Sequence, residues 1–165
     1  MSLDGYIADN QGDLGFLSMV EQPGEDYGYA EFTQSVDAII LGRKTYEKVL
    51  SMGFEYPHTD KAVYIITRTE RPAIGSFEFY TGDLATLVSE LKSKPGKHIY
   101  CDGGAEIVHE LARLQLIDEY IISVIPVLLG TGIRLFKDDR PEQKLRLLSS
   151  KAFEKGLLQV HYQVV

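Results

Sequence analysis

Apolar residues along the chain gather in short continuous runs, and these runs alternate with stretches in which apolar residues recur at helical spacing. Runs of this kind are typical of buried strands, which we expect at Val36–Leu41, Ala62–Thr67, Phe77–Tyr80 and Ile99–Cys101. The stretches between them predict helices over Glu25–Ser35, over Lys44–Met52, from Asp83 as the cap to Pro95-Gly96, and from directly after Gly104. Strands that alternate with helices predict a mainly parallel sheet covered on both faces.

The last third of the chain has a different pattern. Glu119–Leu128 predicts a long strand that Pro126 interrupts, and Gly130–Gly132 predicts a turn. Alternating apolar residues over Leu145–Leu147 and Leu157–Val165 then predict antiparallel strands at a sheet edge. The fold class is therefore α/β with a mixed, mostly parallel sheet and an antiparallel C-terminal hairpin.

Length and composition narrow the class of protein. The chain has 165 residues, which fits one domain over 1–165, with 44% apolar and 25% charged residues. Its net charge is −7 and it has no basic run, which argues against nucleic acid as a partner. The longest apolar runs are far shorter than the roughly 20 residues of a membrane span, so no membrane partner is expected.

The cysteine and the histidines indicate neither a disulfide nor a metal site. Cys101 is the single cysteine, so no internal disulfide can form, which is consistent with a reducing, cytoplasmic setting. The four histidines show no metal-ligand spacing, and the phosphate, hydrolase and zinc-deaminase motifs are absent. No metal is expected.

Three predicted strands end in residues that could bind a ligand. The ends are Gly42–Thr45, Thr67–Arg68 and Asp102–Gly104. In sheets of this class, ligands bind beyond the carboxyl ends of the strands. We therefore expect the functional site where these three ends meet.

The glycine-containing ends favour a phosphate. Gly103 and Gly104 lack Cβ atoms between a strand and a helix, which lets a ligand approach the backbone at the positive end of the helix. A tight turn without a ligand explains this pair equally well. Arg43 and Lys44 are cations at a helix start, which is unfavourable unless an anion offsets them, although a solvated first turn is the alternative.

The other two candidates are a cation and a carboxylate. Thr67 and Arg68 could hold a terminal phosphate such as the 2′-phosphate of NADPH, whereas an arginine after a strand is more often simply exposed. Asp102 could accept hydrogen bonds from a substrate or relay a proton. A turn or helix-capping role is the alternative for Asp102.

Several segments together resemble a known family. They are SLDGYIA at Ser2–Ala8, VDAIILGRKTYE at Val36–Glu47, YIITR at Tyr64–Arg68, DGGAEIVHEL at Asp102–Leu111, IDEYIISVIPVLLGTGIRLF at Ile117–Phe136, and G-x-L-x-V-x-Y at Gly156–Tyr162. In this order and spacing they resemble the dihydrofolate reductase-like family that includes the riboflavin-pathway reductase (RibD C-terminal) domain. The resemblance covers nearly the whole chain and implies a three-layer α/β/α fold that binds NADPH.

The resemblance also implies roles for individual positions. Asp102 matches an acidic substrate contact of riboflavin-pathway reductases, and dihydrofolate reductases carry a carboxylate on their first helix, for which Asp26 or Glu31 is nearby. The Gly103-Gly104 bond corresponds to one that is cis in dihydrofolate reductases. The implied cofactor contacts are Ile7 at the nicotinamide, Gly42, Arg43, Lys44 and Thr45 at a phosphate turn, Thr67 and Arg68 at the 2′-phosphate, and Gly103, Gly104, Ala105, Glu106 and Ile107 at the pyrophosphate.

The chain departs from the family pattern in three places. It starts at Met1 within a pattern that a complete first strand normally precedes, so either the recorded start is truncated or that strand is missing. Phe16 stands where many relatives have Trp. The motifs that hold a phosphoribityl group in riboflavin enzymes are absent, so the resemblance leaves the substrate open.

The sequence therefore predicts an NADPH-dependent reductase of the dihydrofolate reductase or 5-amino-6-(5-phosphoribosylamino)uracil reductase type. Hydride would pass to a pterin, a pyrimidine or a similar heterocycle, with Asp102 or Asp26 as the catalytic carboxylate. The alternatives are a nucleotide-binding protein without turnover and a structural dimerisation module. Riboflavin-pathway relatives are commonly dimers, and the edge strand at Leu157–Val165 points to a homodimer.

Overall fold

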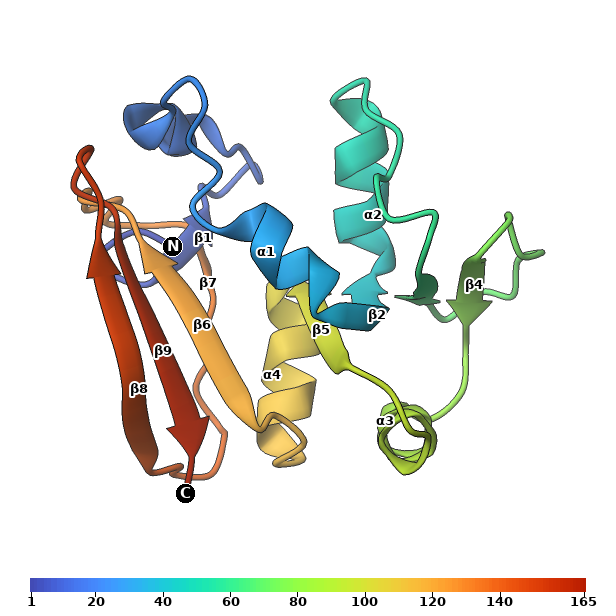
Figure 1. Ribbon diagram of the computed structural model, residues 1–165. Helices are drawn as coiled ribbons and strands as arrows, with labels where there is room; N and C mark the ends of the chain where they lie inside the picture. Colours follow the sequence, from blue (N-terminus) through green and yellow to red (C-terminus); the bar gives the residue numbers. More distant parts are fainter. The chain divides into compact units, whose positions relative to one another are not determined.

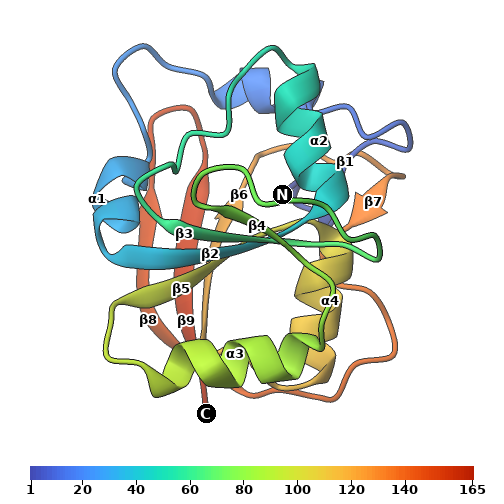
Figure 2. The same cartoon turned by 90° about the vertical axis from the view of Figure 1, so that its right-hand side faces the viewer.

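A computed structural model describes residues 1–165, and the chain forms two compact units. We call Gly28–Leu111 the central unit, and Met1–Tyr27 with Ala112–Val165 the terminal unit. Figures 1 and 2 show the elements of both units. No helix in the structure is both long and apolar enough to cross a membrane.

The central unit is built on a parallel sheet. Its strands are β2 (Val36–Gly42), β3 (Ala62–Ile66), β4 (Phe77–Tyr80) and β5 (His98–Gly103), in the order β4-β3-β2-β5. All three pairings are parallel, as predicted. The apolar run of β2 lies in the middle of the sheet, where Ile39, Ile40 and Leu41 are at most 1% exposed.

Helices cover both faces of this sheet, as a parallel sheet requires. They are α1 (Tyr29–Gln34), α2 (Arg43–Ser51), α3 (Leu84–Ser93) and α4 (Ala105–Arg113). Figures 1 and 2 show α1 and α2 on one face and α3 and α4 on the other. The α3 helix begins as predicted, because an Asp83 carboxylate oxygen accepts a hydrogen bond from the Thr86 backbone N–H.

The terminal unit is antiparallel. Its main sheet has the order β6-β9-β8, formed by β6 (Glu119–Val124), β8 (Leu145–Ala152) and β9 (Leu158–Val164). A second ladder pairs β1 (Tyr6–Ala8) with β7 (Ile133–Arg134), and a 3₁₀ helix, η1, covers Gly15–Val20. Val20, Ile125 and Leu157 form a small core. The predicted antiparallel hairpin is therefore confirmed.

Several boundaries differ from the sequence prediction. The helix expected from Glu25 begins only at Tyr29, because Gly28 precedes it with a left-handed φ of 80° that no regular helix continues through. The strand expected to reach Leu128 ends at Val124, close to Pro126, which has no N–H for a ladder. In contrast, β5 does not stop at Cys101 but runs on to Gly103.

The start of the chain pairs with the segment after β6. Ser2 forms a parallel bridge with Ile125, and Leu3 N–H donates to the Val127 carbonyl at 2.8 Å. Within the terminal unit, the residues before β1 therefore already pair, as a strand would, with the segment that contains Ile125 and Val127.

Candidate functional site

The three predicted strand ends lie at one edge of the central sheet. In the register of the parallel pairs, Gly42 of β2 lies opposite Ile66 of β3, and Leu41 lies opposite Gly103 of β5. Thr67-Arg68 and Gly104 directly follow these positions. The structure therefore brings together the segments that sequence reasoning proposed to meet.

At this edge the backbones of two segments come close because side chains are absent. A Cβ atom added to Gly42 would lie 3.2 Å from Cγ1 of Ile107, and one added to Gly104 would lie 3.0 Å from Oγ1 of Thr45. The Gly103-Gly104 peptide bond is cis, which matches what the resemblance implied, and Gly103 has a φ of 87°. We call Gly42, Thr45, Gly103 and Gly104 the glycine cradle.

Two helices start at the glycine cradle. α2 begins at Arg43 and α4 at Ala105, directly after the glycines. The first N–H groups of a helix have no acceptor within the helix, and together with the helix dipole they favour an anion. Ala105 and Ile107 are buried at the start of α4, whereas Glu106 is exposed. The cradle thus offers backbone donors and a hydroxyl without intervening side chains.

The cations of α2 require a correction to the sequence argument. Arg43 forms a 2.6 Å ion pair with Glu47, one turn along the helix, and Arg71 lies 3.5 Å from the same carboxylate. The hydrogen bond from Arg43 lowers the pKa of Glu47 from its ordinary value. Glu47 therefore offsets the charge of Arg43, so this charge does not by itself demand an anionic ligand. Lys44 is exposed.

Thr67 and Arg68 differ in their surroundings. Thr67 is buried, and its hydroxyl accepts a hydrogen bond from the Thr69 backbone N–H at 3.2 Å, which shapes the turn after β3. Arg68 is exposed on the same turn. Its guanidinium is free to reach an anion at this edge, as the proposed 2′-phosphate contact requires.

The carboxylate of Asp102 accepts hydrogen bonds from two tyrosine hydroxyls. Its Oδ2 accepts a hydrogen bond from the Tyr56 hydroxyl at 2.6 Å, and its Oδ1 accepts one from the Tyr100 hydroxyl at 2.8 Å. Burial, followed by the negative charge of Asp102, raises the pKa of both tyrosines. Asp102 lies inside β5 rather than at a helix start, and its carboxylate is bound to side chains. The capping alternative is therefore wrong.

A second polar pair lies beside this carboxylate. The Tyr29 hydroxyl is 2.7 Å from Nε2 of His58, and the His58 ring packs against the Tyr56 ring with centroids 5.5 Å apart. Burial, and then the charge of Asp102, raises the pKa of Tyr29 to about 12. Burial lowers the pKa of His58 from its ordinary value, although the Asp102 charge opposes this shift.

Sequence reasoning missed these aromatic residues. Tyr100 could have been found, because residues two apart on a strand share a face, so Tyr100 and Asp102 must point the same way. Tyr56 and His58 lie in the irregular segment after α2, whose position no periodicity predicts. Burial raises the pKa of Cys101, next to Asp102, to about 11, so it is not a reactive thiolate.

Two predicted site residues belong to the terminal unit. Ile7 lies in β1 and is half-buried, and Asp26 lies in the irregular segment before α1 and is exposed. Their roles stay predictions.

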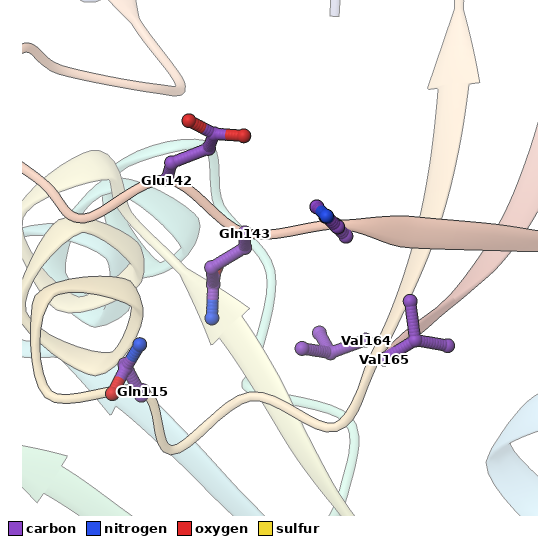
Figure 3. A pocket seen from close by; sticks show the side chains of 6 residues that line it. Gln115, Glu142, Gln143, Val164 and Val165 are labelled. Carbon is purple, nitrogen blue, oxygen red and sulfur yellow. The ribbon is translucent and has the colours of Figure 1, made fainter.

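A hollow in the terminal unit contains no predicted site residue. Its volume is about 510 Å³, and Figure 3 shows the side chains around it. The lining residues are Gln115, Glu142, Gln143, Lys144, Val164 and Val165. Gln143 is already engaged, because its Oε1 accepts a 2.9 Å hydrogen bond from the Tyr120 hydroxyl.

Several solved structures have the same fold as this chain. A crystal structure named "Putative riboflavin biosynthesis protein" from Shewanella sp. PV-4 is 30% identical, with a TM-score of 0.89 over 100% of this chain and 95% of that one. A pyrimidine reductase-like protein from Corynebacterium diphtheriae has a TM-score of 0.70 at 17% identity, over 100% of this chain and 89% of that one. RibD of Acinetobacter baumannii has a TM-score of 0.69 at 18% identity, over 99% of this chain and 55% of that one.

Sequence comparison gives two relatives from Bacillus subtilis (strain 168). The uncharacterized protein YwjB is 41% identical over 170 residues, which covers 98% of this chain and 92% of that one. The uncharacterized protein YyaP is 29% identical over 174 residues, which covers 98% and 90%. The family model of the RibD C-terminal domain matches residues 1–159. The α/β architecture, the parallel sheet with its antiparallel hairpin and this match together show that the chain belongs to the RibD C-terminal domain family.

Proposed function

We propose that this protein is an NADPH-dependent reductase that transfers hydride to a C=N or C=O bond of a pterin- or pyrimidine-type ring. The observation that carries the proposal is the order of residues on one strand end. Asp102, a carboxylate that can bind a heterocycle, directly precedes Gly103 and Gly104 of the glycine cradle. The proposed contact for a phosphate-containing cofactor and the proposed polar contact for a ring are therefore adjacent on one strand end.

The residues at the cradle fit a dinucleotide. A diphosphate needs N–H donors near the backbone, and the starts of α2 and α4 at the cradle offer them. The proposed contacts are Gly42–Thr45 and Gly103–Ile107 for phosphates and Thr67-Arg68 for the 2′-phosphate. When bound, NADPH supplies the hydride, and the protein aligns the reactants and excludes water.

Asp102 limits which hydrogen-bonding groups a substrate can place next to it. Each carboxylate oxygen has two lone pairs, and one on each is used by Tyr56 or Tyr100. An ionised carboxylate only accepts hydrogen bonds, so the matching edge of the substrate must donate them through ring N–H or amino groups. Pterins and aminopyrimidines have such edges. Asp26 remains the second candidate for the carboxylate role.

The names of the structural relatives support the same substrate class. One is named a pyrimidine reductase-like protein, and another is named for riboflavin biosynthesis. The chain lacks the phosphoribityl-binding motifs, so we propose the ring class and no single substrate within it. A cytoplasmic location belongs to the same proposal, because the cofactor pool and a reduced Cys101 fit that compartment.

Titration with NADPH, followed by an oxidation assay at 340 nm with dihydrofolate and a panel of aminopyrimidines, tests the proposal. We expect saturable binding of NADPH and its oxidation by at least one ring of the panel. Binding without any turnover would instead establish the non-catalytic nucleotide-binding alternative. Absence of binding would contradict both and favour a structural module.

A further inference from the structure

The Tyr29–His58 pair lies close to Asp102 but is not part of the carboxylate's hydrogen-bond set. Tyr29 is the first residue of α1, and α1 packs on β5 through an edge-to-face contact of Phe32 with Tyr100, whose ring centroids are 4.9 Å apart. Tyr29 is 44% exposed, whereas His58 is 6% exposed. The phenol can therefore reach a ligand, while the imidazole behind it is held in place.

His58 also borders solvent on another side. It lines an open groove of about 510 Å³ together with Thr33, Gln34, Asp60, Lys61 and Lys97. The lysines of this groove are anchored, since the Lys61 amine donates to the Val36 carbonyl at 3.1 Å and the Lys97 amine donates to the Gln34 carbonyl at 2.8 Å. Asp60 pairs with Lys61 at 3.2 Å. The groove is polar and open to solvent, so water in it lies next to His58.

A reductase of the proposed kind needs a proton donor. Hydride addition to the carbon of C=N or C=O leaves an electron pair on nitrogen or oxygen, and this pair must take a proton. Asp102 is a poor donor, because its oxygens accept hydrogen bonds from Tyr56 and Tyr100 and an ionised carboxylate carries no proton. The phenol of Tyr29 carries one.

We propose that Tyr29 donates the proton that completes substrate reduction, and that His58 delivers a replacement proton to Tyr29 from the groove. This inference rests on the proposed function and adds the proton route. It makes Tyr29 a catalytic residue, because its hydroxyl would touch the substrate, and His58 a positioning and relay residue.

The proton steps balance without another reagent. The Tyr29 O–H bond breaks as the substrate N–H or O–H bond forms, and the phenolate then takes the proton on Nε2 of His58. His58 takes a proton at Nδ1 from water as it gives up the one on Nε2, and proton exchange with solvent then restores the Nε2–H tautomer before the next turnover. The sum is one hydride and one solvent proton added across C=N or C=O. Because the pKa of Tyr29 is raised to about 12, the phenol is protonated and ready at neutral pH.

Kinetics of two variants and a control test the inference. NADPH oxidation is measured with the best substrate of the dihydrofolate and aminopyrimidine panel for Tyr29→Phe, His58→Ala and Tyr64→Phe. We expect kcat to fall about 100-fold for Tyr29→Phe, as is typical for loss of a general acid, with KM changed less than about threefold. The His58→Ala loss should be partly restored by added imidazole. Tyr64→Phe removes a phenol elsewhere on the central sheet and should behave like the wild type.

A second measurement needs neither cofactor nor turnover. In ¹⁵N-histidine NMR spectra of the free protein, Tyr29→Phe should shift the ring nitrogens of His58, whereas Tyr64→Phe should not. Unchanged His58 signals would show that the contact is absent in solution and would overturn the inference.

The remaining outcomes separate the two proposals. If the wild type oxidises NADPH but Tyr29→Phe keeps its kcat, or changes KM alone, the proton route is wrong and the reductase proposal stands. If the wild type binds NADPH and reduces no ring of the panel, the reductase proposal fails and the proton route fails with it.

Discussion

The Tyr100 hydroxyl donates a 2.8 Å hydrogen bond to Asp102, two residues farther along the same strand. The two side chains share a face of β5 because successive strand residues alternate between faces. Tyr56 donates to the other carboxylate oxygen at 2.6 Å, so the plane of the carboxylate is fixed from both sides. This arrangement presents Asp102 as a rigid acceptor directly before the glycine cradle.

Removing one of these donors should destabilise the fold. We expect Tyr100→Phe to lower the free energy of unfolding by about 1.5–3 kcal/mol, because a half-buried hydrogen bond to a charged group is lost. Urea denaturation followed by circular dichroism measures it, and Tyr64→Phe is the matched control. A Tyr100→Phe variant as stable as Tyr64→Phe would show that the bond contributes nothing to the fold.

Stability should also depend on pH through His58. Burial lowers the pKa of His58 in the folded protein below its ordinary 6.5, so the unfolded chain binds a proton more readily. The contribution is fully present above pH 6.5 and is lost as the pH falls through the folded value. After burial, the charges of Asp102, Lys61 and Asp60 act on the pKa of His58, and Tyr29 and Tyr56 contact its ring.

Melting temperatures measured between about pH 7.5 and 5 test this dependence. We expect the decline toward acid to be shallower in His58→Gln than in the wild type. His98→Gln removes an exposed histidine and should leave the slope unchanged. Parallel curves for the wild type and His58→Gln would contradict the assignment.

Cofactor choice should depend on Arg68. Its exposed guanidinium on the turn after β3 can pair with the 2′-phosphate that distinguishes NADPH from NADH. We expect Arg68→Ala to weaken NADPH binding by about 1.5–3 kcal/mol and to leave NADH binding nearly unchanged. Fluorescence titrations with the two cofactors measure the difference, and equal weakening of both would refute the contact.

The central sheet was predictable because its signals are local. A buried parallel strand must be a continuous apolar run, and the run at 77–80 matches β4 at both ends. Gly42 and Asp102–Gly104, which directly follow such runs in the sequence, also indicated where the cradle lies. The predicted ends of helices and strands were wrong where a glycine such as Gly28 or a proline such as Pro126 interrupts an apolar pattern.

The contacts of Tyr56 and His58 around Asp102 could not be predicted in the same way. Tyr56 and His58 come from an irregular segment, and the bond of Tyr56 to Asp102 and the packing of His58 on Tyr56 depend on long-range contacts that leave no periodic pattern in the sequence. The cation Arg43 at the start of α2 suggests an anionic ligand, but Glu47 one turn later pairs with it. The i,i+4 spacing of this pair is visible in the sequence.

We expect a homodimer that uses the terminal sheet. β8 pairs only with β9, so its other edge is open, and the register places Leu145, Leu147, Val164 and Tyr162 on one face. Leu145 and Leu147 are 44% and 52% exposed. Light scattering at micromolar concentration should give twice the chain mass.

The same surface supplies a variant and a control for this assembly. Leu147→Lys should give a monomer, because it places a charge within the apolar face. Ser149→Lys adds the same charge on β8 opposite His161, beyond the register shift, and should leave the dimer intact. A monomeric wild type, or a dimer unaffected by Leu147→Lys, would contradict this interface.

The last prediction concerns Gly104. A Cβ atom there would lie 3.0 Å from the Thr45 hydroxyl oxygen, inside the space that the proposed diphosphate needs. The left-handed φ belongs to Gly103 and not to Gly104, so Gly104→Ala carries no backbone penalty of that kind and the fold should be retained. We expect at least a tenfold loss of NADPH affinity, which is about 1.4 kcal/mol. The measurement is an NADPH titration beside a thermal melt of the ligand-free protein. Unchanged affinity in a well-folded variant would mean that the loop is only a turn, and the cofactor site would then have to lie elsewhere.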